Sequence, residues 1–310
     1  MTGGAGFIGS HLVERLLVDG TRVRVLDNFS SGARANLPFA ARYRRQLEVV
    51  RGDIRNLPTV LRAARGARII FHQAAMRSVP RSVKDPLGAN ENNVSGTLNV
   101  LEAARRGRVP RVVYASSSSV YGDRPDLPKR EDQPVSPLSP YAASKAAGEQ
   151  YAAIWTRLYG VETVGLRYFN VFGPRQDPKS EYAAVIPRFI LWAIRGRPLE
   201  VHGDGSQSRD FTYIDNVVEA NLLAAKAPEA AGEAFNVGCG SRVSLLEIIA
   251  MLEGMLGHPL KRKHTPSRVG DVPHTLADIG RAKKDMGYAP LVDFDEGLKR
   301  TVEFFTGRRP

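Results

Sequence analysis

The chain has 310 residues, with 44 Lys and Arg against 32 Asp and Glu, and a formal net charge of +12. Hydrophobic residues make up 43% and charged residues 25%, which fits a soluble globular protein and excludes a disordered, collagen-like or coiled-coil chain. This length allows one large domain or two.

The positive charge comes mainly from arginine, with 34 Arg against 10 Lys spread along the chain. The densest cluster, Lys261–His264, is short. Proteins that bind nucleic acid more often show a basic stripe interleaved with aromatic residues. We therefore expect no nucleic-acid partner, whereas an anionic substrate would need only a few of these arginines.

Signals for disulfides, metals and membranes are sparse. The single cysteine, Cys239, excludes a disulfide framework or a cysteine metal cluster and suits a reducing, cytoplasmic location. The six histidines lack zinc-ligand spacing, so we expect no metal site. No apolar run approaches the roughly 20 residues that span a bilayer. The first residues lack the basic leader of a signal peptide, so no membrane partner is expected.

Short apolar runs alternate with helical patterns through the first half of the chain. The predicted strands are Val23–Leu26, Leu47–Val50, Ile69–Phe71, Val112–Ala115 and Thr163–Leu166. The predicted helices are Ser10–Asp19, Pro58–Arg65, Ala89–Arg106 and Tyr141–Tyr159. Strands and helices that alternate at this spacing predict an α/β fold with a doubly wound parallel sheet.

Beyond about residue 167 this alternation loosens. Turns rich in Gly, Pro and Asp follow at Phe172–Asp177, Gly203–Ser208 and Ser267–Pro273. We expect residues 1–167 to form the sheet domain, with a later contribution near residues 209–236. Residues 168–310 would form mainly a smaller α/β portion that binds the substrate.

The loop Gly3–Gly9 contains glycines at a spacing of three and three. Gly3 permits the tight turn, Gly6 lets the backbone approach a pyrophosphate, and Gly9 lets the following helix pack closely. The helix N-terminus then faces the phosphates with its unpaired N–H groups. Such a loop normally follows the central strand of the sheet, yet only Met1 and Thr2 precede it. Either the start is assigned one strand too late, or the sheet is unusual and lacks its central strand. We expect the first, because an open centre would leave buried backbone groups unpaired.

An acidic residue ends the strand that follows the glycine-loop helix. The carboxylate of Asp27 could accept both ribose hydroxyls of NAD, and it would repel the 2′-phosphate of NADP. The sequence therefore predicts NAD as the cofactor. Asp53 and Ile54, after the next strand, could meet the adenine.

Tyr141 and Lys145 lie one turn apart on one face of a predicted helix. An ammonium beside a phenol favours the phenolate and lowers the tyrosine pKa from about 10, which would make Tyr141 a general base. The pair follows a serine-rich strand end, Ala115–Gly122, at the carboxyl edge where parallel sheets bind ligands.

Together these motifs resemble the extended short-chain dehydrogenases/reductases, in the branch of the nucleotide-sugar 4-epimerases. The resemblance implies a Rossmann-type NAD-binding domain and covers nearly the whole chain. It is carried by Thr2–Gly9, Asp27–Asn28, Asp53, His72–Ala75, Asn93–Val94, Ser116–Gly122, Tyr141 with Lys145, Arg167–Pro174, Gly203–Phe211 and Arg268–Asp278.

The resemblance implies a role for each matching residue. Ser117, Tyr141 and Lys145 would be catalytic. NAD would be bound by Gly3, Gly6, Phe7, Ile8, Gly9, Asp27, Asn28, Asp53, Ile54, Gln73, Ala74, Ala75, Asn93, Tyr141, Lys145 and Tyr168. A UDP-sugar would be bound by Ser117, Ser118, Asn170, Arg209, Arg268 and Thr275. Both arginines would hold the diphosphate, because a guanidinium offers paired donors to phosphate oxygens.

The resemblance also implies a reaction. Tyr141 would remove the proton of the sugar 4-hydroxyl with the help of Ser117, and C4 would pass its hydride to NAD. The 4-keto sugar would then turn its other face to the cofactor before hydride and proton return. UDP would stay anchored, and no net oxidation would occur.

Details of the motifs separate the related activities. Relatives that act as 4,6-dehydratases carry Thr-Asp-Glu where this chain has Ser117–Ser119, so dehydration is not expected. Epimerases of UDP-glucuronate tend to carry Thr at the position of Asn170 and a further basic residue near Asp177. A uronate substrate, for epimerisation or decarboxylation, is therefore less expected.

Thr275 bears on the choice between a plain and an acetylated sugar. In epimerases restricted to UDP-glucose and UDP-galactose, a tyrosine can fill the wall beside the sugar 2-substituent, whereas Thr275 leaves room for an acetamido group. Residues 169–178 and 182–187 also resemble epimerases of UDP-N-acetylglucosamine. We expect interconversion of UDP-N-acetylglucosamine and UDP-N-acetylgalactosamine, with UDP-glucose 4-epimerisation as the alternative.

Two further expectations concern function class and assembly. A nonenzymatic NAD-binding regulator could share this fold, but such proteins tend to lose the tyrosine–lysine pair that this chain keeps. The predicted helices Ala89–Arg106 and Tyr141–Tyr159 resemble those of a four-helix dimer interface. The resemblance therefore implies a homodimer.

Overall fold

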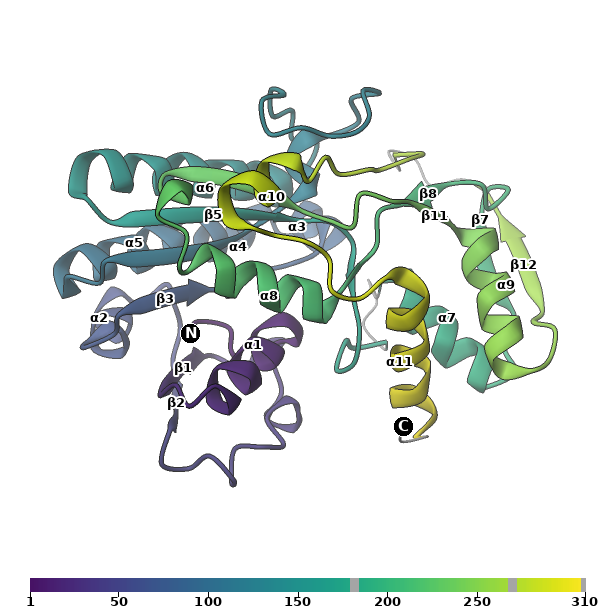
Figure 1. The fold of residues 1–310 in the computed structure, drawn as a ribbon, viewed down its shortest axis with the longest axis horizontal. Coiled ribbons are helices and arrows are strands. Elements are labelled where there is room, and N and C mark those ends of the chain that lie inside the picture. The colour runs from purple at the N-terminus through teal and green to yellow at the C-terminus, as the bar shows by residue number, and fades with distance from the viewer. Residues whose placement is uncertain (179–183, 267–271, 308–310) are drawn as a thin grey trace.

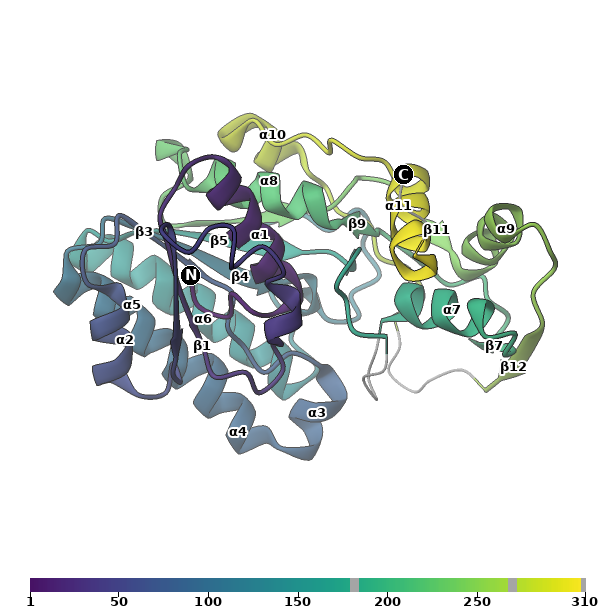
Figure 2. The same cartoon turned by 90° about the horizontal axis from the view of Figure 1, so that it is seen from below.

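The computed structural model describes residues 1–178, 184–266 and 272–307. A parallel sheet covered by helices forms one part of the molecule, and a smaller group of elements lies beside it (Figure 1). Figure 2 shows helices on both faces of the sheet. One face carries α2 (Leu57–Ala64), α5 (Gly96–Gly107) and α6 (Pro140–Tyr159), and the other carries α1 (Phe7–Val18) and α8 (Ile214–Ala224).

All five predicted strands are present, and the predicted α/β fold with a parallel sheet is confirmed. They are β1 (Val23–Asp27), β2 (Leu47–Arg51), β3 (Ile69–His72), β4 (Arg111–Ser117) and β5 (Glu162–Tyr168). β1 pairs with β2, and β3, β4 and β5 pair side by side, each in parallel. A later strand, β10 (Glu233–Val237), adds to the outer side of β5. β4 and β5 are buried along almost their whole length, as their continuous apolar runs require of strands covered on both faces.

The predicted helix Ala89–Arg106 is divided in the structure. A short helix, α4 (Pro86–Asn90), leads into a wide π-helical turn, Glu91–Ser95, before α5 begins. Pro86 occupies the first turn of α4, and Asp85 caps it by accepting a hydrogen bond from the backbone N–H of Gly88. Such wide turns often lie at functional sites, and this one contains Asn92 and Asn93.

Between β1 and β3 the sheet is bridged by the first two residues of the chain. Thr2 makes parallel bridges to Leu26 and His72, and the N-terminal ammonium of Met1 donates to the carbonyl of Arg24 at 2.8 Å. Burial, with the Arg24 charge, lowers the pKa of this ammonium to about 5. A cavity of about 1030 Å³ continues the gap, lined by both strands and by the adjoining helices.

The smaller portion is built from short strands and separate helices. Its elements are β6 (Val171–Phe172), α7 (Val185–Ile194), β7 (Leu199–His202), β8 (Ser208–Arg209), β9 (Thr212–Tyr213), β11 (Val243–Ser244), α9 (Leu245–Leu256), β12 (Arg262–Thr265) and α11 (Phe294–Thr306). α8 and β10, by contrast, return to the sheet, as does α10 (Gly280–Met286), which lies against β10. Phe172, Phe211 and Phe294 pack with ring centroids 5.3–6.3 Å apart. These rings belong to one buried cluster that also includes sheet residues, so both portions share a core.

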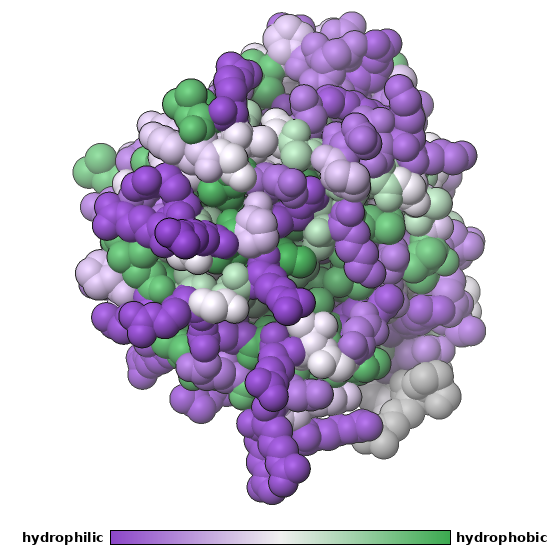
Figure 3. Space-filling model, turned by 60° about the vertical axis from the view of Figure 1, so that its left-hand side comes forward, coloured by the Kyte–Doolittle hydropathy of each residue, from purple (hydrophilic) through white to green (hydrophobic). Residues whose placement is uncertain are grey.

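On the face drawn in Figure 3, hydrophilic residues are spread widely, with hydrophobic atoms recessed between them. No helix in the described ranges is both long and apolar enough to cross a membrane.

Candidate cofactor and substrate site

The glycine loop packs too tightly for side chains. A Cβ on Gly3, whose φ is +67°, would lie 2.6 Å from the backbone nitrogen of Ala74, and one on Gly9 would lie 2.1 Å from the carbonyl oxygen of Gly3. Gly6 precedes α1 without a side-chain cap, and no acidic residue occupies the first turn. The N–H groups at this helix end are therefore left for an anion.

Asp27 anchors this loop to the end of β1. One carboxylate oxygen accepts the N–H of Ala5 at 2.9 Å, and the other accepts the N–H of Phe29 at 2.8 Å. Each oxygen retains a further lone pair, and the buried carboxylate lines a pocket of about 160 Å³. Acceptors here suit hydroxyl donors, whereas a phosphate would be repelled.

This pocket collects most of the residues predicted to bind the cofactor. Those that line it are Gly3, Gly6, Phe7, Ile8, Gly9, Asp27, Asn28, Ile54, Gln73, Ala74, Ala75, Tyr141, Lys145 and Tyr168. Sequence reasoning missed Ser30, Ser31, Gly32, Gly52, Arg77 and Asn92, which line it too. The polar turn after Asp27 was a signal for the first three.

Asn93 is not among the residues that line this pocket, and its expected contact with the cofactor stays a prediction. Its side chain is 1% exposed; the amide oxygen accepts the N–H of Met76 at 2.7 Å, and the amide nitrogen donates to the carbonyl of Met76 at 3.0 Å. The same nitrogen donates to Ser144 Oγ at 2.9 Å. Asn93 thus ties the segment that follows Ala75 to α6.

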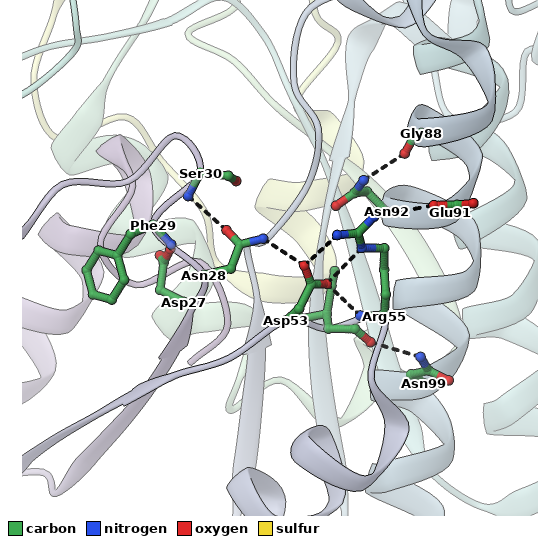
Figure 4. Close-up of polar contacts among 11 residues, drawn as sticks. Asp27, Asn28, Phe29, Ser30, Asp53, Arg55, Gly88, Glu91, Asn92 and Asn99 are labelled. Carbon is green, nitrogen blue, oxygen red and sulfur yellow. Dashed lines mark hydrogen bonds and ion pairs between the residues drawn. The ribbon is translucent and has the colours of Figure 1, made fainter.

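Asp53 does not line the pocket, but it contacts Asn28, which does. Arg55 binds both of its carboxylate oxygens, and Asn28 Nδ2 donates to Asp53 Oδ2 at 2.9 Å (Figure 4). The hydrogen bond from Arg55 is the main reason why the pKa of Asp53 falls to about 2. The ionised Asp53 therefore orients Asn28, whose Oδ1 accepts the N–H of Ser30.

Ser117 and Tyr141 meet where β4 ends and α6 begins. Ser139 caps α6 by accepting the N–H of Ala142, which places Tyr141 in the first turn. Ser117 Oγ accepts hydrogen bonds from the N–H and the hydroxyl of Ser119, at 3.2 and 2.9 Å. A hydrogen bond with Ser117 lowers the pKa of Tyr141, but burial outweighs it and raises that pKa overall. The sequence-based expectation of a lowered pKa is therefore wrong for the cofactor-free site.

The Lys145 ammonium is held by the backbone of β4. It is 4% exposed and donates to the carbonyl of Ala115 at 2.8 Å, while its nitrogen lies 5.8 Å from the centroid of the Tyr141 ring. Burial lowers the pKa of Lys145 to about 8, and the charge of Glu149 opposes this effect. The ammonium thus faces the phenol across the base of the pocket.

A hydrogen-bonded trio positions the residue at the end of β5. Gln73 Nε2 donates to the Tyr168 hydroxyl at 3.0 Å, and Asn221 Nδ2 donates to the same oxygen at 2.9 Å. Burial raises the pKa of Tyr168 to about 12, so it stays a neutral phenol. Asn221, on α8, was missed because its position is set by a helix more than fifty residues away in the chain.

Two predicted substrate residues, Asn170 and Thr275, contact the backbone of Asp210. Asn170 Nδ2 donates to the carbonyl of Asp210 at 2.9 Å and to Thr275 Oγ1 at 3.2 Å. The Asp210 side chain accepts the N–H groups of Cys239, Gly240 and Ala277. Burial raises the pKa of Asp210 to about 6, although these N–H groups lower it. Asp210, which sequence reasoning missed, thus ties together the loops that carry Asn170 and Thr275.

The remaining predicted substrate residues are only partly placed. Arg209 Nη1 donates to the carbonyls of Ser208 and Pro273, at 3.0 and 2.8 Å. Ser118 opens the short 3-10 turn Ser118–Tyr121, directly after Ser117. Arg268 lies outside the described residues.

Asp177 and Arg77 both line a cavity of about 720 Å³. It shares Asn28, Ala75 and Asn92 with the smaller pocket, so the two adjoin.

Cys239 has no activated thiol, because burial raises its pKa to about 12.

The chain is similar to known proteins along nearly its whole length. The model of the "NAD dependent epimerase/dehydratase family" matches residues 1–238. The chain is 43% identical over 310 residues to a UDP-glucose 4-epimerase of Mycolicibacterium smegmatis, covering 99% of this chain and 98% of that protein. A solved UDP-N-acetylglucosamine 4-epimerase of Methanobrevibacter ruminantium, in complex with UDP-N-acetylmuramic acid, is 38% identical with a TM-score of 0.94, over 99% and 97% of the two chains. The UDP-glucose 4-epimerase of Thermus thermophilus in complex with NAD is 38% identical with a TM-score of 0.89, over 99% and 98%.

Proposed function

The chain belongs to the NAD dependent epimerase/dehydratase family, and from this premise we propose that it interconverts UDP-N-acetylglucosamine and UDP-N-acetylgalactosamine. The broader activity follows from its relatives: the protein is an isomerase, an NAD-dependent UDP-sugar 4-epimerase. The finer assignment of the sugar rests on one observation, the small side chain of Thr275 beside Asn170.

NAD fits the residues that are present. The glycine loop leaves no room for a Cβ, the start of α1 offers N–H groups to the diphosphate, and Asp27 offers acceptors to the ribose hydroxyls. When bound, NAD supplies an acceptor for the hydride of the sugar C4 and returns that hydride. Gln73 and Tyr168, bonded to each other at 3.0 Å, line the same pocket as neutral groups.

The chain's own residues handle the proton. As a phenolate, Tyr141 would take it from the sugar 4-hydroxyl and give it back at the same oxygen. Because Ser119 donates to Ser117, the Ser117 proton is left for Tyr141 or for the sugar oxygen. The Lys145 ammonium stabilises the phenolate that forms when Tyr141 has lost its proton.

The substrate diphosphate and sugar face the loops that Asp210 joins. The Arg209 guanidinium is fixed by the carbonyls of Ser208 and Pro273 and would bind phosphate oxygens. The Thr275 N–H donates to the carbonyl of Ser208 at 3.1 Å, and its own carbonyl accepts the Asp210 N–H at 2.9 Å. These bonds keep Thr275 in place beside Asn170, where its small side chain supports the proposal of a 2-acetamido substituent.

Initial rates with UDP-N-acetylglucosamine, UDP-glucose and UDP-glucuronate test this assignment. We expect the highest kcat/KM with UDP-N-acetylglucosamine and a weaker reaction with UDP-glucose, because an open pocket rejects a smaller substrate poorly. The alternative, a UDP-glucose 4-epimerase, is favoured by the name of the Mycolicibacterium smegmatis relative. A higher kcat/KM with UDP-glucose would establish that alternative.

We further propose that the protein is a homodimer formed through α5 and α6. Large hydrophobic side chains are exposed on the outer face of α6, with Ile154 at 40% and Leu158 at 66% exposure. Leu87, on the neighbouring α4, is 77% exposed. Light scattering after size exclusion should give twice the 34.0 kDa chain mass, and Leu158→Glu should halve it.

A further inference from the structure

A third polar residue continues the stripe of Tyr141 and Lys145 along α6. Glu149 lies one turn beyond Lys145, as Lys145 lies one turn beyond Tyr141, so all three share a helix face. Glu149 is 8% exposed, although a carboxylate is seldom buried without partners. Its partners therefore decide what it does.

Glu149 clamps the ends of two neighbouring strands. Its Oε1 accepts the Ser116 hydroxyl at 2.5 Å and Arg167 Nε at 2.9 Å, while its Oε2 accepts Arg167 Nη2 at 2.8 Å. Ser116 and Arg167 are partners in register on β4 and β5. The next pair in that register is Ser117 with Tyr168. The clamp thus holds the residues that immediately precede two proposed site residues.

Stability alone is a weak reason for this arrangement. A buried ion pair loses much hydration, and an apolar replacement of similar volume is often neutral or stabilising. Arg167 also donates to the Tyr121 hydroxyl at 2.8 Å, which in turn donates to Asn236 Oδ1 at 2.7 Å. A polar network that is fully bonded specifies one arrangement of its members, and this one specifies where β4 ends.

Glu149 is also the anionic neighbour of the Lys145 ammonium. The groups that face Lys145 from the other elements are Tyr114 on β4, its ring 5.1 Å away, and His72 on β3. Burial keeps both neutral, because it raises the pKa of Tyr114 and lowers the pKa of His72 to about 3. On α6 itself Tyr141 is also protonated, since burial raises its pKa. The charge that favours the ammonium therefore comes from Glu149.

We propose that Glu149 is a positioning residue of the active site, which fixes the β4 end beneath Ser117 and places a negative charge one turn behind Lys145. This inference rests on the proposed roles of Ser117, Tyr141 and Lys145. The inference goes beyond those roles, because it also requires a negative charge one helical turn beyond Lys145.

The test compares Glu149→Gln with a matched variant, Glu162→Gln, in the full chain with NAD. Glu162 pairs with Arg111 at 2.6 Å, in register on the same two strands but at their opposite end. For each variant, kcat and KM are measured from pH 6 to 10 with the UDP-sugar that the unaltered chain turns over fastest. Thermal melting shows that each variant is folded.

We expect Glu149→Gln to lower kcat by roughly 10- to 100-fold at similar KM, as small displacements of catalytic groups do. The decline of kcat at alkaline pH, the alkaline limb of its pH profile, should move to lower pH by about one unit or more. Loss of the nearby negative charge lets Lys145 lose its proton at a lower pH. Glu162→Gln should change neither quantity. Equal kcat and equal alkaline limbs in the two variants would overturn the proposal while leaving the epimerase assignment intact. If the unaltered chain turns over no UDP-sugar, the proposed function falls and this inference falls with it.

If Glu149→Gln does not fold, Glu149→Asp and Ser116→Ala decide the question, since neither removes the buried charge. Glu149→Asp draws the carboxylate away from Ser116, and Ser116→Ala removes the hydroxyl that it accepts. We expect lower kcat at unchanged KM, with the alkaline limb in its original place. An unchanged kcat in both variants would overturn the proposal.

Discussion

Ser119 Oγ donates a hydrogen bond to Ser117 Oγ at 2.9 Å, and this contact sets the direction of the Ser117 proton. The backbone N–H of Ser119 occupies the same oxygen from 3.2 Å. With its acceptor positions used, Ser117 has its own proton to donate, and its hydrogen bond lowers the pKa of Tyr141 against the effect of burial. The serines of this run therefore differ in what they contact. Ser117 hydrogen-bonds to the Tyr141 phenol, and Ser119 orients Ser117.

Removal of the Tyr141 hydroxyl should abolish epimerisation without abolishing binding. Tyr141→Phe keeps the ring but removes the proton acceptor, and we expect kcat to fall by about 10²- to 10⁴-fold. NAD and UDP affinities, measured by calorimetry, should change little. The control is Tyr151→Phe, ten residues further along α6, whose ring packs on Trp155. Epimerisation by Tyr141→Phe at the rate of Tyr151→Phe would refute the assignment.

The reaction should lose rate at alkaline pH. Lys145 has its pKa lowered to about 8 by burial, so it carries a positive charge below that pH and loses it above. Without the ammonium the Tyr141 phenolate is less stable, and we expect kcat to decline above about pH 8. Initial rates under saturating sugar would show this limb. A kcat that stays constant up to pH 10 would contradict a role for the Lys145 charge.

A larger side chain at position 275 should select against the acetylated sugar. Thr275→Tyr fills the wall beside Asn170, and we expect kcat/KM for UDP-N-acetylglucosamine to fall at least about tenfold more than for UDP-glucose. The second sugar is the internal control, since it shares the UDP and the reacting carbon. Equal losses with both sugars would mean that Thr275 does not border the 2-substituent.

Cofactor choice should depend on the charge at position 27. Asp27→Asn keeps an acceptor but removes the negative charge, so NAD affinity should fall and the discrimination against NADP should weaken. We expect the ratio of the two dissociation constants to move at least several-fold toward NADP, as a charge–phosphate repulsion implies. Asp19→Asn, an exposed acid that ends α1, is the control and should leave the ratio unchanged. An unaltered ratio in Asp27→Asn would place the 2′-position elsewhere.

An added apolar strand should stabilise the gap between β1 and β3. Neighbouring strands lie about 4.8 Å apart, and the cavity of about 1030 Å³ beside Met1 lies between two parallel strands. We expect four β-branched residues placed before Met1 to raise the Tm by several degrees, since roughly 1 kcal/mol shifts Tm by a few degrees at this size. A Gly-Ser extension of equal length is the control. Equal melting of the two extended chains would show that the gap accepts no strand.

The same extension should change how stability depends on pH. The Met1 ammonium has a pKa near 5 in the folded chain against 8 when unperturbed, so between these values the unfolded chain binds the extra proton. Stability is therefore lost as pH falls from 8 toward 5. The apolar extension replaces this ammonium with an amide. The Tm of the extended chain should therefore exceed that of the unextended chain by more at pH 5.5 than at pH 8.5. An advantage independent of pH would mean that the amine is not buried.

Several elements followed from local pattern alone. The apolar runs of β4 and β5, the glycine spacing before α1 and the one-turn spacing of Tyr141 and Lys145 are each set within a few residues. The family resemblance followed from the same motifs, and the match to residues 1–238 confirms it. Local sequence could do this because turns, caps and buried strands depend on nearby residues.

Tertiary structure decided what those residues touch. Asn93 matches a cofactor-binding motif, and packing joins its amide to the backbone of Met76. The pKa of Tyr141 is set mainly by burial, which the spacing of residues in the sequence does not reveal. The Asp210 carboxylate binds loops that lie 29 and 67 residues further along the chain. The fold and the cofactor could be predicted from short motifs, and the catalytic set remains a prediction from motifs of the same kind. Only the folded chain decided the partners, the protonation and the supporting charges, because desolvation and long-range hydrogen bonds exist only once distant segments pack together.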